Sequence, residues 1–248
     1  LASGTTTIVN AAMEPEIPAL AEWLNRCGAK ITGAGTSEII IHGVKRLHPQ
    51  PVEIIPDRIE TGSFVILAVA TRSPLRITHC RPDHLEVPLH ILRQMGVKIK
   101  TSASEIQIVS VPKQLKPVDI FTHEYPGFPT DMQAPMTVLL TQAKGESRVT
   151  ESLFDGRLLF TDQLSKMGTH ITLSGAHTAF IKGPTPLVGR RLESPDLRAG
   201  LAFVIAALIA KGETQLDNAY MIDRGYESLE HRLKKIGANI QRISYERT

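Results

Sequence analysis

The chain repeats one short phrase four times. The copies are LNRCGAKI at Leu24–Ile31, LRQMGVKI at Leu92–Ile99, LSKMGTHI at Leu164–Ile171 and LKKIGANI at Leu233–Ile240. Their glycines lie 68, 72 and 69 residues apart. A glycine that closes an amphipathic run is typical of a helix ending in a left-handed residue. A period this regular indicates a duplicated architecture, so equivalent positions of the copies can be compared.

Each full copy is predicted to run strand, helix, strand, helix, strand, strand. In the second copy the predicted elements are Val52–Ile55, Arg58–Ala70, Leu75–Thr78, His84–Met95, Val97–Lys100 and Glu105–Val109. Asp57 and Glu60 have the spacing of a capping box at the first helix, with Asp in place of the usual Ser or Thr. The last two strands largely alternate apolar and polar residues, as half-buried strands do. The pattern predicts an α/β fold built of repeated βαβαββ units.

The first and last copies are incomplete. The first has a predicted strand at Thr5–Val9, a helix at Glu14–Arg26 and a strand at Glu38–Ile41. The third runs from Asp131 to Ile181, and the fourth from Asp196 to a last strand at Ile240–Ser244. A missing strand leaves an unpaired sheet edge. We therefore expect the natural protein to have residues upstream of Leu1, some of which complete the last sheet.

Two prolines mark a linker between the first and second copies. The stretch Leu47–Pro51 reads LHPQP, which favours extended or turn backbone. We expect a boundary near residues 47–56. Residues 1–55 would form the last repeat of a first, incomplete domain, and residues 56–248 a second domain of three repeats.

Composition is typical of a globular protein. Of the 248 residues, 42% are hydrophobic and 21% are charged. The longest apolar run, Leu201–Ala210, is too short to span a bilayer, which takes about 20 residues. No signal peptide is visible, so we expect a cytoplasmic location without membrane contact. A net charge of +3 without a Lys/Arg tract argues against nucleic-acid binding. Cys27 and Cys80 lack metal or redox spacing, which predicts free thiols.

Acidic residues recur at two loop positions of the repeat. The helix-opening acids, which precede the first helix of a copy, are Asp57, Asp131 and Asp196. The second-helix loops, which precede the second helix, are Glu14–Glu16, Pro82–His84, Phe154–Arg157 and Ile222–Glu227. An aspartate before a helix is a preferred N-cap worth about 1 kcal/mol, so three in register are explained by an inherited cap. Helix N-termini also bind anions, so several that face one pocket would form an anion site.

Four arginines lie beside these acids. They are Arg58, Arg157, Arg198 and Arg224. Arginine binds phosphate and carboxylate groups through parallel hydrogen bonds. Taken singly, each arginine is explained by a surface ion pair. Their clustering on equivalent loops favours a shared anion site.

Other local motifs predict no further site. Gly33–Thr36 has two glycines but lacks the full dinucleotide fingerprint, and its place between two strands predicts a hairpin turn. His79, Cys80 and His84 straddle a strand end and a helix start, so we expect no metal site there. The chain has no nucleophile elbow and no phosphate-binding P-loop sequence.

Six segments carry a resemblance to a known family, and they follow one another along the chain. They are TIVNAA at Thr7–Ala12, EPEI at Glu14–Ile17, PDRIETG at Pro56–Gly62, FPTDMQA at Phe128–Ala134, DLRA at Asp196–Ala199 and IDRGYE at Ile222–Glu227. With them the chain resembles the enolpyruvyl transferases, and among these the UDP-N-acetylglucosamine 1-carboxyvinyltransferases, over the C-terminal three-fifths of a member. The resemblance implies an inside-out α/β barrel. It also implies transfer of the enolpyruvyl group of phosphoenolpyruvate to the 3-hydroxyl of UDP-N-acetylglucosamine, the first committed step of peptidoglycan synthesis.

The resemblance assigns roles to individual residues. It implies catalytic roles for Asp131, Arg224 and Asp196, and substrate contacts at Asp131, Leu153, Phe154, Arg157, Arg198 and Arg224. Asp131 matches the proposed general base that contacts the sugar 3-hydroxyl. Arg224 matches an arginine that binds the phosphate or carboxylate of phosphoenolpyruvate. Asp57 matches the family too, but we interpret it as a structural cap.

Some of the family's functional groups have no counterpart in this chain. The Cys or Asp that donates a proton from a mobile loop, and a Lys-Asn pair, would lie upstream of Leu1. Neither Cys27 nor Cys80 lies in a matching motif. We therefore expect the chain alone to be inactive and to need the N-terminal part of the same protein. The implied ligands are UDP-N-acetylglucosamine and phosphoenolpyruvate, with no metal or redox cofactor.

Two other functions stay open. The related shikimate-pathway enolpyruvyl transferase shares the repeated fold, although the PTDMQ and DRGYE motifs favour the sugar-nucleotide enzyme. A non-catalytic sugar-nucleotide-binding relative would keep the fold, and the upstream Lys-Asn pair and loop acid would distinguish it.

Overall fold

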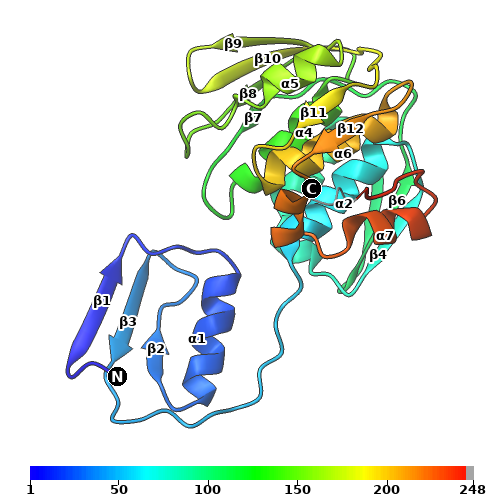
Figure 1. The fold of residues 1–248 in the computed structure, drawn as a ribbon. Coiled ribbons are helices and arrows are strands. Elements are labelled where there is room, and N and C mark those ends of the chain that lie inside the picture. The colour runs from blue at the N-terminus through cyan, green and yellow to red at the C-terminus, as the bar shows by residue number, and fades with distance from the viewer. Residues whose placement is uncertain (244–248) are drawn as a thin grey trace, which may run out of the picture.

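The computed structural model describes residues 1–243 and has two parts joined by one extended segment (Figure 1). The smaller part, called here the N-terminal unit, contains β1 (Thr5–Val9), α1 (Glu16–Arg26), β2 (Lys30–Thr32) and β3 (Glu38–His42). Its strands pair antiparallel in the order β1-β3-β2. Trp23 Nε1 donates a hydrogen bond to Gln50 O at 3.0 Å, and His48 N donates to Cys27 O at 2.8 Å. Residues 48–50 therefore pack on the N-terminal unit.

The larger part, called here the main unit, covers residues 58–243. Its α-helices are α2 (Arg58–Ala70), α3 (Glu86–Gln94), α4 (Gln133–Leu140), α5 (Thr161–Lys166), α6 (Leu197–Ile209) and α7 (Leu229–Lys235). Its strands are β4 (Leu75–Thr78), β5 (Lys98–Thr101), β6 (Glu105–Ser110), β7 (Ile120–Phe121), β8 (Gly145–Thr150), β9 (His170–Ser174), β10 (Thr178–Gly183), β11 (Arg191–Glu193) and β12 (Gln215–Asp217). Three short 3₁₀ turns are η1 (Pro82–Leu85), η2 (Thr130–Met132) and η3 (Ala219–Arg224).

Three helices, α2, α4 and α6, contact one another inside the main unit, and the sheets lie around them (Figure 1). Their sequences are apolar nearly all round: α6 reads LRAGLAFVIAALI, and every residue of α4 is buried. A helix without a polar face is stable in a soluble fold only where other elements surround it. None of the helices within residues 1–243 has both the length and the apolar character needed to cross a bilayer.

The sheets of the described residues share one strand-pairing pattern: the first two strands of a copy pair in parallel, and its other pairs are antiparallel. The third copy has the order β7-β8-β10-β9, in which the first two strands are parallel and the other pairs are antiparallel. Within residues 1–243, the second copy keeps β4-β6-β5 without a first strand, and the fourth keeps the parallel pair β11-β12 without the last two. The predicted repeat is therefore present, and different copies lack different strands.

Two predicted strands do not form within the described residues. Val52–Ile55 is not a strand, because no neighbouring strand pairs with the segment that joins the two units. Ile240–Ile243 likewise belongs to no sheet, and Ser244 lies outside the described residues. Two helices begin two residues later than predicted: α1 starts after Pro15, and α3 starts after the 3₁₀ turn η1.

The phrase glycines end helices as predicted. The φ angles of Gly28, Gly96, Gly168 and Gly237 are +99°, +100°, +96° and +100°. A Cβ atom in this left-handed region crowds the following carbonyl oxygen, so glycine is the residue that adopts it without strain. In the first three copies the turn leads directly into β2, β5 and β9. The predicted hairpin turn at Gly33–Thr36 is also confirmed, between antiparallel β2 and β3.

Candidate active site

The parallel strand pairs of the repeat determine where its loops gather. Parallel neighbours end at the same edge of a sheet, so the loops after β7 and β8 emerge side by side. The loops after β11 and β12 do the same in the fourth copy. Asp131 and Asp196 follow the first strand of each pair, and the second-helix loops follow the second. The topology therefore brings the two sets of loops together.

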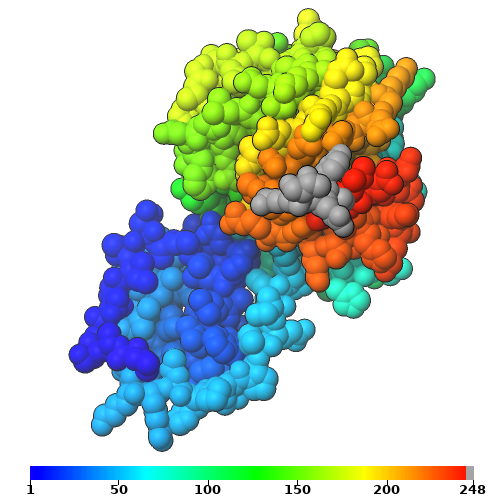
Figure 2. All heavy atoms as spheres, viewed as in Figure 1, coloured from blue at the N-terminus to red at the C-terminus, as the bar shows by residue number. Residues whose placement is uncertain are grey.

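A cleft of about 220 Å³ opens where these loops meet the N-terminal unit. Its walls include Glu14 from the N-terminal unit and Tyr125, Thr130, Asp131, Leu153 and Phe154 from the main unit. Figure 2 shows the N-terminal unit, in blue, meeting the main unit along one edge. Both parts of the chain therefore contribute to this site.

Asp131 holds two arginines at the cleft. Arg157 Nη2 donates to Asp131 Oδ1 at 2.6 Å, and Arg198 Nη2 donates to Asp131 Oδ2 at 2.7 Å. The Asp131 side chain is 33% exposed, and those of Arg157 and Arg198 are 24% and 17% exposed. Charge-assisted hydrogen bonds of this length are stronger than neutral ones, and partial burial protects them from screening. The result is a carboxylate fixed between two cations, with one side open to solvent.

Arg198 extends this hydrogen-bond chain into the interior. Its Nη1 donates to Tyr226 Oη at 3.3 Å, and Tyr226 Oη lies 3.0 Å from Ser63 Oγ of α2. Tyr226 is fully buried, and burial raises its pKa. Burial by itself lowers the pKa of Arg198, but the charges and hydrogen bonds of Tyr226 and Asp131 outweigh it, so this pKa is raised. Arg198 is therefore a permanent cation, held from both sides.

The helix-opening acids are of two kinds. Asp57 Oδ1 accepts hydrogen bonds at 2.7 and 3.0 Å from the backbone N–H groups two and three residues further on, and Asp196 Oδ1 does the same at 2.7 and 3.0 Å. Both are N-caps. Asp131 instead gives both oxygens to arginine side chains. The predicted capping box is half formed, because the Glu60 carboxylate pairs with Arg232 and returns no bond to Asp57.

Arg58 connects the N-terminal unit to the cleft. Arg58 Nε donates to Glu16 Oε1 at 3.0 Å, and its guanidinium lies 5.7 Å from the centre of the Tyr125 ring. Burial raises the pKa of Tyr125. Glu14 Oε1 accepts from Tyr125 N–H at 3.5 Å, while Glu14 Oε2 is buried and has no hydrogen-bond partner among the described residues. This side of the cleft therefore offers a cation and an unused acceptor.

The remaining predicted site residues are divided. Leu153 and Phe154 line the cleft, and the Arg157 guanidinium lies 5.0 Å from the centre of the Phe154 ring. The Arg224 side chain is exposed and makes no hydrogen bond or ion pair with any residue that the structure describes. The structure therefore brings Phe154 and Arg157 to Asp131 and leaves Arg224 outside this group.

Two buried residues of the site were missed by sequence reasoning. Tyr226 lies within the quoted IDRGYE motif, which was the available signal, but no role was predicted for it. Glu151 directly follows β8 and accepts hydrogen bonds from Thr130 and from the backbone of Leu153. A glutamate at a strand end is ordinarily exposed, so the pattern predicts a solvent-facing side chain here.

Metal ligation has no support in the geometry. Residues 1–243 contain no group of three or more His, Cys, Asp or Glu side chains that could hold a metal ion. Cys27 and Cys80 are buried thiols, and burial raises the pKa of Cys80. His84 is mostly buried, and burial lowers its pKa.

Comparison with known proteins agrees with this architecture. The sequence model of the EPSP synthase (3-phosphoshikimate 1-carboxyvinyltransferase) family matches residues 1–233. The UDP-N-acetylglucosamine 1-carboxyvinyltransferase of Desulfosudis oleivorans is 46% identical over 244 residues, which cover 98% of this chain and 58% of that protein. UDP-N-acetylglucosamine 1-carboxyvinyltransferase 2 of Bacillus subtilis is 48% identical over 242 residues, covering 98% and 56%. The chain thus spans a little over half the length of these relatives.

Solved structures show the same fold. The enolpyruvyl transferase NikO from Streptomyces tendae aligns with a TM-score of 0.82 at 30% identity, covering 96% of this chain and 57% of NikO. EPSP synthase from Acinetobacter baumannii aligns with a TM-score of 0.74 at 18% identity, covering 98% and 59%, which shows likeness of fold alone. With helices inside and sheets outside, the predicted inside-out α/β fold class is confirmed. The chain therefore belongs to the EPSP synthase family of enolpyruvyl transferases.

Proposed function

We propose that this chain supplies the C-terminal part of an enzyme that transfers the enolpyruvyl group of phosphoenolpyruvate to the 3-hydroxyl of UDP-N-acetylglucosamine. Relatives named for carboxyvinyl transfer to that sugar nucleotide, 46% and 48% identical to this chain, support the substrate pair. The observation that carries the proposal is Asp131, fixed between Arg157 and Arg198 beside the cleft. A carboxylate next to fixed cations suits a reaction in which a hydroxyl loses its proton and a phosphate departs.

The proposed reaction is an addition followed by an elimination. The Asp131 carboxylate takes the proton of the sugar 3-hydroxyl, and the hydroxyl oxygen forms a bond to C2 of phosphoenolpyruvate. C3 gains a proton from an acid outside this chain. Inorganic phosphate then leaves C2 while C3 loses a proton, which restores the carbon–carbon double bond. Arginines hold the phosphate until it departs.

Arg157 and Arg198 have two tasks in this proposal. Without substrate they occupy both oxygens of Asp131. A guanidinium has five N–H donors, so the phosphate or carboxylate of phosphoenolpyruvate can bind the same arginines and weaken their hold on Asp131. The carboxylate then has free lone pairs when the second substrate is in place. Proton abstraction is thereby coupled to the binding of phosphoenolpyruvate.

The other predicted residues enter the same proposal. Arg224, unpaired among the described residues, binds the phosphate or carboxylate group. Leu153 and Phe154 contact the sugar nucleotide from the cleft wall. Asp196 fixes the start of α6 and with it the backbone of Arg198. We place the reaction in the cytoplasm, as the first committed step of peptidoglycan synthesis.

A chimeric protein tests the substrate assignment. The upstream part of the Bacillus subtilis relative is joined to Leu1 of this chain, and phosphate release is measured with phosphoenolpyruvate and one of two acceptors. Turnover with UDP-N-acetylglucosamine is expected. Turnover with shikimate 3-phosphate alone would identify the shikimate-pathway enzyme instead. Binding of the sugar nucleotide without turnover would identify a non-catalytic relative.

Asp131→Asn in the chimera tests the base assignment. We expect kcat to fall by about 10²- to 10⁴-fold, as for loss of a general base. Binding of UDP-N-acetylglucosamine, measured by calorimetry, should weaken far less. Asp119→Asn is the control, because Asp119 forms an exposed surface pair with Arg148. Equal losses of turnover and binding, or loss of neither, would count against Asp131 as the base.

A further inference from the structure

We infer that Glu151 is a positioning residue. Its single buried carboxylate fixes the two walls of the cleft relative to each other. Glu151 directly follows β8, is 0% exposed, and pairs with no Lys or Arg among the described residues. Removing a carboxylate from water without a counter-ion is costly unless several hydrogen-bond donors replace the water. At this position four donors do so.

The two carboxylate oxygens of Glu151 serve different loops. Oε2 accepts from Thr130 Oγ1 at 2.7 Å. Oε1 accepts from the backbone N–H groups of Leu153 at 3.0 Å and Phe154 at 3.3 Å, and from Thr122 Oγ1 at 3.0 Å. A carboxylate accepts at both ends, so it can satisfy all four donors together. An amide side chain of the same size would present its own N–H groups to some of them.

These loops are the walls of the cleft. Thr130 immediately precedes Asp131, and both line one wall, while Leu153 and Phe154 line the other. The loops emerge from the parallel strands β7 and β8, and hydrogen bonds between Ser152 and Thr122 also join them next to the strands. Glu151 bridges them at the strand ends. Through Thr130 it fixes the peptide that carries Asp131, and through the other wall it fixes the turn that leads to Arg157.

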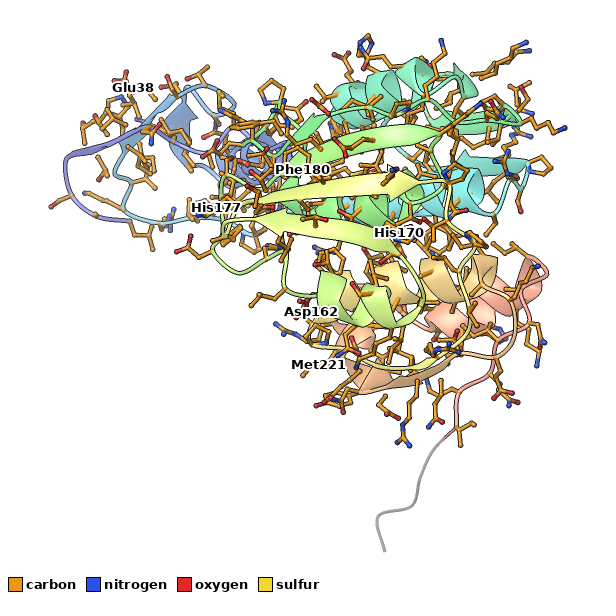
Figure 3. The ribbon with its side chains drawn as sticks, turned by 90° about the horizontal axis from the view of Figure 1, so that it is seen from above. Glu38, Asp162, His170, His177, Phe180 and Met221 are labelled. Carbon is orange, nitrogen blue, oxygen red and sulfur yellow. The ribbon has the colours of Figure 1, made fainter. Side chains whose placement is uncertain are left out.

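The backbone of Glu151 is anchored independently of its side chain. Glu151 N donates to His177 O at 2.8 Å, and His177 Nδ1 lies 2.9 Å from Glu151 O. Figure 3 shows His177 at the turn between β9 and β10, at the end of the sheet that faces the N-terminal unit. Loss of the side-chain hydrogen bonds therefore leaves the strands and the Ser152–Thr122 contacts in place, and it releases Thr130, Leu153 and Phe154 from their shared acceptor.

Amide hydrogen exchange on the chain tests this inference without any substrate. In Glu151→Gln, we expect the amides of Leu153 and Phe154 to exchange about tenfold faster or more, because each loses a charged acceptor. Ser147→Ala is the matched control. Ser147 is buried on the same strand, and its Oγ accepts from Val118 N at 3.2 Å. Its loss should lower stability without changing exchange at residues 153 and 154.

Kinetics of the chimera test the consequence for catalysis, and this part rests on the proposed function. Small displacements of positioning groups cost about 10²-fold in rate, so we expect kcat/KM of Glu151→Gln to fall by about that factor. Thr130→Val removes the Oε2 bond alone and should give a smaller loss in the same direction. Because both changes break one linkage, the double variant should lose little more than Glu151→Gln.

The outcomes separate the two proposals. Unchanged exchange at residues 153 and 154, an equal kinetic loss in Ser147→Ala, or additive losses in the double variant would overturn the role of Glu151. If Glu151→Gln does not fold, Thr130→Val decides through its kcat/KM relative to Ser147→Ala. If the wild-type chimera has no turnover, the proposed function fails, and hydrogen exchange still decides whether Glu151 holds the loops.

Discussion

Asp196→Ala measures what an N-cap contributes to the central helix α6. The carboxylate accepts two backbone N–H bonds, at 2.7 and 3.0 Å, and the residue is exposed, so its removal breaks the cap without disturbing the core. Loss of an Asp cap costs about 1 kcal/mol. Loss of its negative charge at the positive end of the helix dipole adds roughly 0.3–1 kcal/mol. We therefore expect a destabilisation of about 1.5 kcal/mol.

Thermal unfolding of the chain, followed by circular dichroism, measures this effect. For a chain of this size, 1 kcal/mol corresponds to a Tm change of about 2–4 °C, so Tm should fall by about 3–6 °C. Asp57→Ala, which loses the equivalent two bonds at α2, should behave alike. Asp196→Asn keeps an acceptor oxygen and should lose only the smaller, charge-dependent part. An unchanged Tm in Asp196→Ala, or equal effects of Ala and Asn, would refute the cap assignment.

Three further changes probe other parts of the fold. Tyr226→Phe removes a buried hydroxyl with two partners and should lower the free energy of unfolding by about 1–3 kcal/mol in urea titrations. Gly168→Ala should lower the free energy of unfolding by about 1–2 kcal/mol in the same assay, because alanine is strained in the left-handed backbone region. A steric clash does not contribute, since the nearest atom to the added Cβ would be 3.8 Å away. An unchanged unfolding midpoint would contradict this. The hydrogen bond from Arg242 holds the pKa of Asp223 below its usual value of 3.8. The pair therefore stabilises the folded chain fully above pH 3.8, and this contribution is lost as the pH falls through the lowered pKa. Asp223→Asn should therefore destabilise the chain more at pH 6 than at pH 2, and a loss of equal size at both would argue against the linkage.

Local signals predicted much of the secondary structure. The boundaries of α2 at Arg58–Ala70 and β4 at Leu75–Thr78 agree with prediction, because a capping aspartate and a short alternating run determine them within a few residues. Val52–Ile55 has comparable β propensity but is not a strand. A strand needs a neighbouring strand for its backbone hydrogen bonds, and whether one is available depends on the whole sheet.

The candidate site was predicted in part. The residue motifs pointed to Asp131, Arg157 and Arg198, and the structure brings these three together. The motifs did not indicate that the Arg224 side chain lies apart from this cluster. They also gave no indication that Glu151 is buried, because the loops that cover it come from distant parts of the chain.

By itself, the sequence determined the fourfold repeat, the glycine that ends each phrase, and the family motifs. Each phrase and each motif consists of residues that are close in sequence, so it can be identified without knowledge of the fold. The sequence also predicted Asp57 as a cap, and only the tertiary structure decided that Asp196 caps a helix too while Asp131 binds two arginines. Those arginines are 26 and 67 residues from Asp131, and they reach it because parallel strand pairs and three packed helices bring the ends of several loops to one edge. The three aspartates are equivalent in local sequence position, so the difference between them comes from their neighbours in space.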